Sequence, residues 1–195
     1  MGYSVEYVTP PQSEPVSLVE LKNHLRVEHD LDNDEITSLG KAARVLTEQY
    51  TNQRWITQSL AVCFSEFCTP VELPVSPVQS VESVQYYDAN GALTTLDAAE
   101  YQTWLAHLPP RISPTPSGTW PGTQFGKDKA VRVDIVAGYG AAGDVPDGAK
   151  AAIRLAVKYW YTKPDGATDP NGRAESLGLP PAAKRLLDLL DTGTY

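Results

Sequence analysis

The segment Gly138–Gly143 (Gly-Tyr-Gly-Ala-Ala-Gly) has the G-x-G-x-x-G spacing with which dinucleotide-binding proteins hold a pyrophosphate. That chemistry requires the glycines to lead directly into a helix, whose free backbone N–H groups meet the phosphate oxygens. Here Asp144, Val145 and Pro146 intervene before a helix can begin, and Asp144 and Asp147 place negative charge where the phosphate would lie. No second parallel strand with a ribose-binding acid is predicted to follow. We interpret the segment as a strand-to-helix turn and predict no nucleotide cofactor.

Oxygen ligands for a hard cation are gathered between two predicted helices. Asp165, Asp169, Asn171 and Glu175 lie in one loop, and carboxylate and amide oxygens are the ligands that Ca²⁺ takes in proteins. The spacing departs from that of an EF-hand because Gly172 directly follows Asn171. A solvated loop is the simpler interpretation, with a cation site as its alternative.

The remaining reactive side chains form no catalytic motif. His24, His29 and His107 have no Cys or His at the spacing of a zinc site, and neither H-E-x-x-H nor G-x-S-x-G occurs. Cys63 and Cys68 would point to opposite faces of one strand, so we predict two reduced thiols. No catalytic residue, metal or cofactor is therefore predicted, and the protein is not expected to be an enzyme. Two alternatives are a hydrolase whose carboxylates only the fold brings together, and a monomeric carbohydrate-binding module with exposed tryptophans in a groove.

Two helices are predicted before residue 55. Ser17 and Glu20 have the spacing of a capping box and begin a helix that we expect to end near His29. Asp32 and Glu35 repeat that spacing and begin a helix of about five turns. Apolar residues recur along it at alternating steps of three and four: Ile36, Leu39, Ala43, Leu46 and Tyr50. So narrow a stripe suits packing against a helix or a neighbouring subunit, as well as an ordinary core contact.

An antiparallel β region is predicted over residues 55–140, after an extended arm at residues 1–16. From Trp55 the apolar period changes to two, and residues 131–137 alternate cleanly. Asp88–Gly91 contains Asn-Gly, the signal of a type I′ hairpin turn, and it follows a predicted strand at residues 80–87.

Helical periodicity returns after Pro146, a favourable first-turn residue. The apolar face of this helix consists of Ile153, Ala156, Val157 and Trp160. A last helix opens at Pro180 or Pro181 and carries Ala183, Leu186, Leu187 and Leu190 on one side. The predicted fold class is α+β: a small helical bundle of N-terminal and C-terminal helices with an inserted antiparallel β module. We expect boundaries at residues 1–54, 55–143 and 144–195.

Composition limits the possible partners. The 195 residues are 42% hydrophobic and 21% charged, as in a folded domain, with a net charge of −8. An acidic chain does not coat a phosphate backbone, which requires clustered Lys and Arg. Residues 1–10 have no signal-peptide pattern, and no apolar run approaches the roughly 20 residues of a membrane span. We therefore expect the protein to be made in the cytoplasm and not to associate with a membrane.

Short segments along nearly the whole chain, taken in order, resemble one family of viral proteins. The opening segments are Pro15–Lys22, His24–Val27, Asp32–Ile36, Ala42–Arg44 and Glu48–Arg54. The central ones are Leu73–Pro74, Pro77–Val81 and Tyr86–Gly91, and the closing ones are Trp120–Pro121, Ala137–Gly140, Val145–Pro146, Ala151–Tyr161 and Leu179–Leu190. In this order they resemble the head–tail connector proteins of tailed bacteriophages and prophages, specifically the adaptor family that forms the first ring below the portal.

This resemblance implies a structural role in the neck of a virion, after synthesis in the bacterial host. The implied partners are the portal protein, copies of the chain in a ring of about twelve, and a downstream neck or tail-completion protein. Genomic DNA would pass through the channel without sequence-specific binding, and an acidic lumen would keep it from sticking. For interfaces we predict Ile36, Leu39 and Leu46 in inter-helix packing and Leu186, Leu187 and Leu190 in docking.

Overall fold

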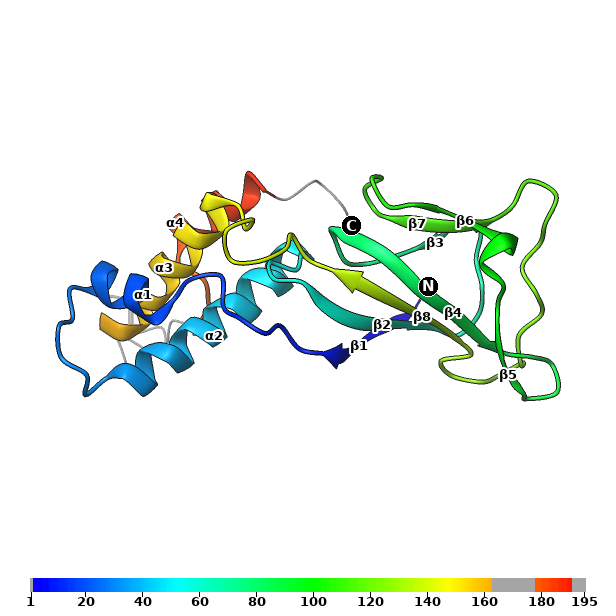
Figure 1. The fold of residues 1–195 in the computed structure, drawn as a ribbon, viewed down its shortest axis with the longest axis horizontal. Coiled ribbons are helices and arrows are strands. Elements are labelled where there is room, and N and C mark those ends of the chain that lie inside the picture. Colours follow the sequence, from blue (N-terminus) through cyan, green and yellow to red (C-terminus); the bar gives the residue numbers. More distant parts are fainter. Residues whose placement is uncertain (1, 163–177, 191–195) are drawn as a thin grey trace, which may run out of the picture. The chain divides into compact units, whose positions relative to one another are not determined.

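A computed structural model of the chain describes residues 2–162 and 178–190. These residues form two compact units (Figure 1). The β unit contains residues 2–12 and 57–139, and the helical unit contains residues 13–56, 140–162 and 178–190. The structure confirms the predicted α+β class: after a first strand, two helices precede and two helices follow the remaining strands in the described sequence.

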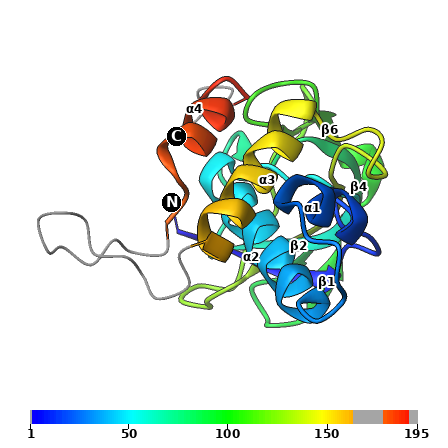
Figure 2. The same cartoon turned by 90° about the vertical axis from the view of Figure 1, so that its left-hand side faces the viewer.

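Four helices build the helical unit: α1 (Leu18–Leu25), α2 (Asn33–Thr51), α3 (Asp147–Thr162) and α4 (Pro181–Asp188). Helix α3 contacts the other three, as Figure 2 shows from the end of the bundle. Its predicted apolar face, Ile153, Ala156, Val157 and Trp160, is buried as expected.

The two predicted capping boxes have different outcomes. At α1 the box forms, because the N–H of Ser17 donates to the Glu20 carboxylate (2.8 Å) and the N–H of Glu20 donates to Ser17 Oγ (3.3 Å). The second box, at Asp32, was a wrong prediction: Asp32 precedes α2 but makes no side-chain cap bond. Its carboxylate instead accepts a hydrogen bond from the Tyr161 hydroxyl at 2.6 Å. Helix α1 also ends earlier than predicted, because Arg26 adopts a left-handed conformation (φ 61°).

The apolar stripe of α2 packs inside the helical unit. Ile36 and Ala43 are fully buried, and Leu39 and Leu46 are half-buried against the same core. Tyr50, the last predicted member of the stripe, is 39% exposed, and its hydroxyl donates to Asp188 at 2.7 Å. The buried face of α2 is wider than the stripe and also contains Gly40, Arg44, Thr47, Glu48 and Thr51.

The β unit contains two antiparallel sheets. The larger has the order β1 (Tyr3–Thr9), β2 (Gln58–Phe64), β8 (Val131–Ala137), β4 (Val78–Tyr87) and β5 (Leu93–Thr95). The smaller has the order β3 (Val71–Glu72), β7 (Arg111–Pro114) and β6 (Tyr101–Trp104). Figure 1 shows the smaller sheet beside one face of the larger. Register aligns Val5, Val62, Val133 and Val84 in one row across the larger sheet, and this row faces the core of the unit.

The hairpin between β4 and β5 forms where it was predicted, but the type I′ turn was a wrong prediction. That turn needs positive φ at both Asn90 and Gly91, and only Gly91 has it (φ 82°). The carboxylate of Asp88 accepts hydrogen bonds from the N–H groups of Asn90 (2.8 Å) and Ala92 (2.9 Å). The Asp88 side chain therefore holds the turn in another conformation.

Two further features of the sequence have structural counterparts. Residues 3–9 of the predicted extended arm are strand β1, paired with β2. Cys63 and Cys68 are free thiols, and burial raises the pKa of each. Among the described residues, no helix combines the length and apolar character needed to cross a membrane.

Candidate interaction surfaces

The glycine-rich segment forms a turn that its own acid closes. Gly140 has φ 139°, and Asp144 Oδ2 accepts a hydrogen bond from the N–H of Ala141 at 2.9 Å. The carboxylate thus occupies the backbone donor that a phosphate would need. This geometry agrees with the predicted strand-to-helix turn.

Candidate metal ligands are dispersed in the part of the chain that the structure describes, where no three His, Cys, Asp or Glu side chains gather around a cation position. The predicted loop with Asp165, Asp169, Asn171 and Glu175 lies outside the described residues. His24 is half-buried, and its pKa is lowered by burial and by the nearby cations Lys158 and Arg154.

Three tryptophans use their indole N–H groups in hydrogen bonds within the protein. The indole N–H of Trp55 donates to Thr47 Oγ1 (2.9 Å), and that of Trp120 donates to the Cys68 carbonyl (2.8 Å). Trp120 also stacks on Phe67 with 4.6 Å between ring centroids. The indole N–H of Trp160 donates to the Gly178 carbonyl at 3.3 Å. Such indoles brace the fold rather than present an open aromatic platform.

Charged side chains on the outer face of the larger sheet neutralise one another. Glu6 on β1 lies 2.6 Å from Lys129 and 3.5 Å from Arg132, and Arg132 lies 2.8 Å from Asp134. The hydrogen bond and charge of Lys129 lower the pKa of Glu6. With two cations against two anions, this row has no surplus charge with which to attract an ionic partner.

The six predicted interface residues differ in what they offer a partner. Ile36 and Leu187 are 0% exposed in the core of the helical unit. The other four, Leu39, Leu46, Leu186 and Leu190, are half-buried and pack against that core. In this conformation only these four have surface available for a contact.

An apolar patch covers the outer side of α4 and the adjoining part of α3. We call it the α4 patch; its residues are Leu155, Pro181, Ala182, Arg185, Leu186 and Leu189, and they border a groove of about 630 Å³. Leu189 is 83% exposed although it was not among the predicted residues. The spacing of Leu186 and Leu189, three residues apart, is a signal that could have revealed it, because such residues share a helix face.

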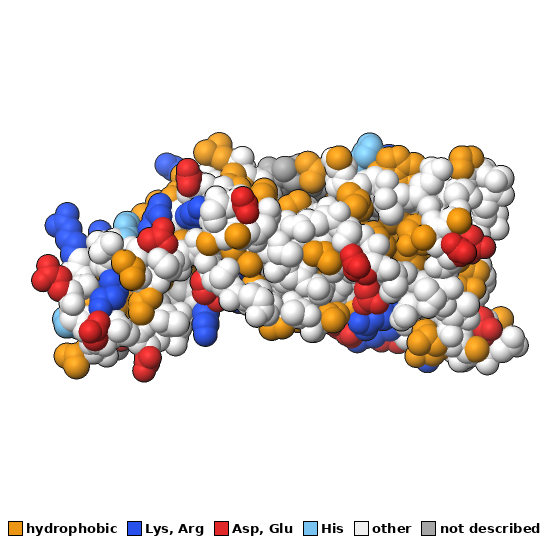
Figure 3. All heavy atoms as spheres, in the orientation of Figure 1, with side chains coloured by type: hydrophobic (Ala, Val, Ile, Leu, Met, Phe, Trp, Pro, Cys, Tyr) orange, Lys and Arg blue, Asp and Glu red, His pale blue; other side chains and the backbone are white. Residues whose placement is uncertain are grey.

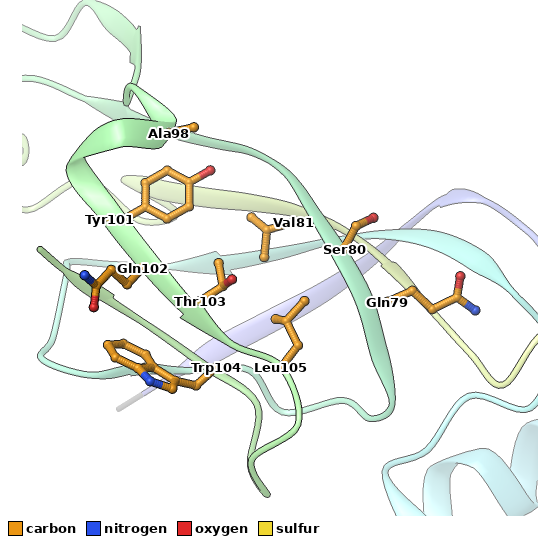
Figure 4. A pocket seen from close by; sticks show the side chains of 9 residues that line it. All are labelled: Gln79, Ser80, Val81, Ala98, Tyr101, Gln102, Thr103, Trp104 and Leu105. Carbon is orange, nitrogen blue, oxygen red and sulfur yellow. The ribbon is translucent and has the colours of Figure 1, made fainter.

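A second groove lies between β4 and β6 in the β unit, with a volume of about 660 Å³. We call it the β4–β6 groove; its residues are Gln79, Ser80, Val81, Ala98, Tyr101, Gln102, Thr103, Trp104 and Leu105 (Figure 4). None of these nine residues is charged, so the groove favours an uncharged occupant. Sequence reasoning did not identify it, because it depends on two strands from different sheets.

Charged side chains of both signs are interspersed on the visible face of the helical unit (Figure 3). No extended basic stripe, of the kind that tracks a phosphate backbone, crosses that face.

Comparisons with known proteins give a match in fold. The sequence matches no protein-family model and no curated protein sequence. A chain from the neck of an empty gene transfer agent particle, computed with C6 symmetry, matches with a TM-score of 0.72 and 19% identity over 94% of both chains. The chain has the fold of a gene transfer agent neck protein.

Two further solved structures extend this result. A chain from the virion of a native gene transfer agent particle gives a TM-score of 0.72 and 22% identity, over 93% of this chain and 94% of that one. A chain from the neck of a native particle, computed with C12 symmetry, gives 0.67 and 23% identity over 94% of both chains. These structural relatives are parts of particles, and the shared fold includes both units.

Proposed function

We propose that the chain is a head–tail connector (adaptor) subunit in the neck of a tailed-phage-like particle. It binds the portal, joins copies of itself in a ring of about twelve, and extends the DNA channel toward a downstream neck protein. The observation that supports this most is the match, over 94% of both chains, to chains from particle necks computed with C6 and C12 symmetry. The segment order that resembles the adaptor family is an independent sequence-based argument for the same role.

Portal docking is assigned in this proposal to the α4 patch. A helix normally turns its apolar residues inward, but α4 has apolar residues on two sides. Leu187 and Ala183 face the core, whereas Leu186 and Leu189 border the outer groove. An exposed leucine such as Leu189 contributes nothing to the isolated fold and gains about 1.5–3 kcal/mol when a partner buries it.

The net charge of −8 suits a channel subunit. Carboxylates repel DNA phosphates because both are negatively charged, so an acidic lumen lets the duplex slide without binding. Long-range repulsion of this kind requires no particular residue, only a surplus of carboxylates on the surfaces that line the channel. A strongly basic lumen in the assembled ring would contradict this part of the proposal.

Native mass spectrometry of the chain alone and with its cognate portal protein tests the role. We expect a complex in which the portal ring carries a ring of this chain, and electron microscopy should show a shared symmetry axis. The isolated chain can remain monomeric, because the portal can act as the template for the ring. Absence of the chain from purified necks, or catalytic turnover of a small substrate, would overturn the proposal.

A further inference from the structure

One edge of strand β6 pairs with no other strand in the described part of the chain. Strand β6 is the last strand of the smaller sheet, with β7 on its other edge. Antiparallel ladders alternate between hydrogen-bonded and non-hydrogen-bonded pairs. The N–H of Thr115 donates to the Glu100 carbonyl (3.1 Å), so the next pair, Tyr101 with Pro114, is of the second kind. The backbone N–H and C=O groups of Tyr101 and Thr103 therefore point away from β7, toward the free edge.

The first half of β4 lacks cover on the same side of the unit. Strand β5 pairs with β4 only at residues 85–87, so residues 79–82 have β8 on one side and none of the described strands on the other. The smaller sheet stops at β6 and leaves this part of β4 exposed to the groove. A fourth strand added to β6 would cover it.

The side chains in the groove suit such a strand. Figure 4 shows Thr103 and Leu105 on the side of β6 nearer to β4, facing Val81, with Trp104 on the opposite side. Val81, Tyr101 and Leu105 also pack against the core of the β unit and form an apolar strip in a groove whose other lining residues include Gln79, Ser80 and Gln102. An added strand could place alternate side chains on this strip while its backbone pairs with β6.

We propose that the β4–β6 groove accepts an extended strand from a different neck protein, which adds to the free edge of β6 as a fourth strand of the smaller sheet. The occupant must be a strand that is not already in a sheet. If it paired with a further strand on its other edge, that further strand would collide with β4, which bounds the groove there. Every strand in the described part of this chain already belongs to a sheet, so none of these strands is free to enter the groove of a second copy. The choice of a neck protein as the source rests on the proposed function.

Amide hydrogen exchange in the isolated chain and in the assembled neck tests the pairing directly. We expect the amide of Thr103, which points to the free edge, to exchange at least tenfold more slowly in the neck, since a new hydrogen bond protects it. Equal rates in the two states would overturn the proposal. Incorporation of the wild-type chain into necks is scored separately, so failure of the neck role is distinguishable from failure of the groove assignment.

A pair of variants separates backbone pairing from side-chain contact. Thr103→Pro removes the N–H that faces the groove, and proline is tolerated at edge positions whose N–H faces solvent. Thr103→Ala is the matched control, because it shortens the side chain and keeps the N–H. We expect the proline variant alone to weaken incorporation, by about tenfold, which corresponds to one lost hydrogen bond. Equal incorporation of the two variants would contradict backbone pairing.

Cross-linking identifies the occupant. A Thr103→Cys variant in assembled necks, treated with a short thiol-directed photo-cross-linker, should join to a neck protein other than this chain. A product made of two copies of this chain would overturn the assignment to a different protein.

Discussion

The carboxylate of Glu48 accepts a hydrogen bond from the backbone N–H of Trp55 at 3.1 Å, which joins α2 to the segment that follows it. Arg44 Nη1 lies 3.1 Å from the same carboxylate, and Arg44 Nε donates to Glu14 at 2.8 Å. The Glu48 side chain is 1% exposed. The buried Glu48 carboxylate, paired with Arg44 and bonded to the Trp55 N–H, thus fixes the C-terminal end of α2 to the residues that lead from the helical unit to the β unit.

Removal of that carboxylate should destabilise the helical unit. We expect Glu48→Ala to lower the free energy of unfolding by about 3–5 kcal/mol, because Arg44 and the Trp55 N–H would lose a buried partner. Glu48→Gln should cost less, since its amide oxygen can still accept from Trp55. Urea titration followed by circular dichroism measures both. The control is Glu28→Ala, an exposed glutamate whose loss should change stability by less than about 0.5 kcal/mol.

Two glutamates should give opposite pH dependence. Hydrogen bonds from Ser17 lower the pKa of Glu20, so its contribution to stability is present above the ordinary glutamate pKa and is lost as the pH falls through the lowered value. Burial raises the pKa of Glu48 despite Arg44, so its contribution is present at low pH and is lost as the pH rises through the raised value. Unfolding free energies of the wild type, Glu20→Gln and Glu48→Gln are measured from about pH 3 to pH 7: the destabilisation caused by Glu20→Gln should grow as the pH rises, and that caused by Glu48→Gln should shrink. If both destabilisations changed with pH in the same direction, this assignment would be wrong.

The sequence predicts the elements whose pattern is local. Residues 131–137 alternate because one face of β8 lies on a core, and Ile153 and Trp160 recur at helical spacing because α3 is covered on one side. Arg44 and Glu48 were missed because a charged pair four residues apart is normally a solvated one. Glu14, distant in sequence, and Trp55, beyond the end of the helix, are partners that help to compensate for their burial.

Surfaces proved harder to predict than elements. The β4–β6 groove requires that β4 and β6 belong to different sheets, and strand pairing between distant segments leaves no local trace in the sequence. The α4 patch was partly anticipated through Leu186, but Leu187 was grouped with it although Leu187 is fully buried and only Leu186 also borders the groove. Which of the two leucines is buried depends on where the core lies relative to the helix, and this is determined by the tertiary structure.

Two glycines of the G-x-G-x-x-G segment should respond differently to alanine. Gly140 has a positive φ, and a Cβ there would collide with the carboxylate of Asp144, so Gly140→Ala should lower the free energy of unfolding by more than about 1 kcal/mol. Gly143 has open space around it, and Gly143→Ala should be neutral or slightly stabilising. Thermal unfolding of the two variants compares them. Equal stabilities would mean that the segment does not need glycine at Gly140 for structural reasons.

At the α4 patch, we predict that one substitution weakens assembly without changing stability and that another lowers stability. Leu189 is 83% exposed, so Leu189→Asp should leave the free energy of unfolding within about 0.5 kcal/mol of wild type. If the patch docks on the portal, the same change should weaken co-assembly by about thirtyfold, from the lost burial of one leucine. Leu187→Ala should behave in the opposite way and cost about 2–5 kcal/mol of stability, because Leu187 is buried in the core.

The control for this comparison is Leu31→Asp, since Leu31 is 89% exposed between α1 and α2, away from the α4 patch. It introduces the same charge at a similarly exposed leucine, so general repulsion by an added carboxylate would affect both variants equally. Portal binding measured by native mass spectrometry at several protein concentrations gives the affinity ratio. A Leu189→Asp variant that binds the portal as tightly as Leu31→Asp would exclude the α4 patch from the contact. Selective loss in Leu189→Asp would place the portal against the side of α4 that faces away from the helical core.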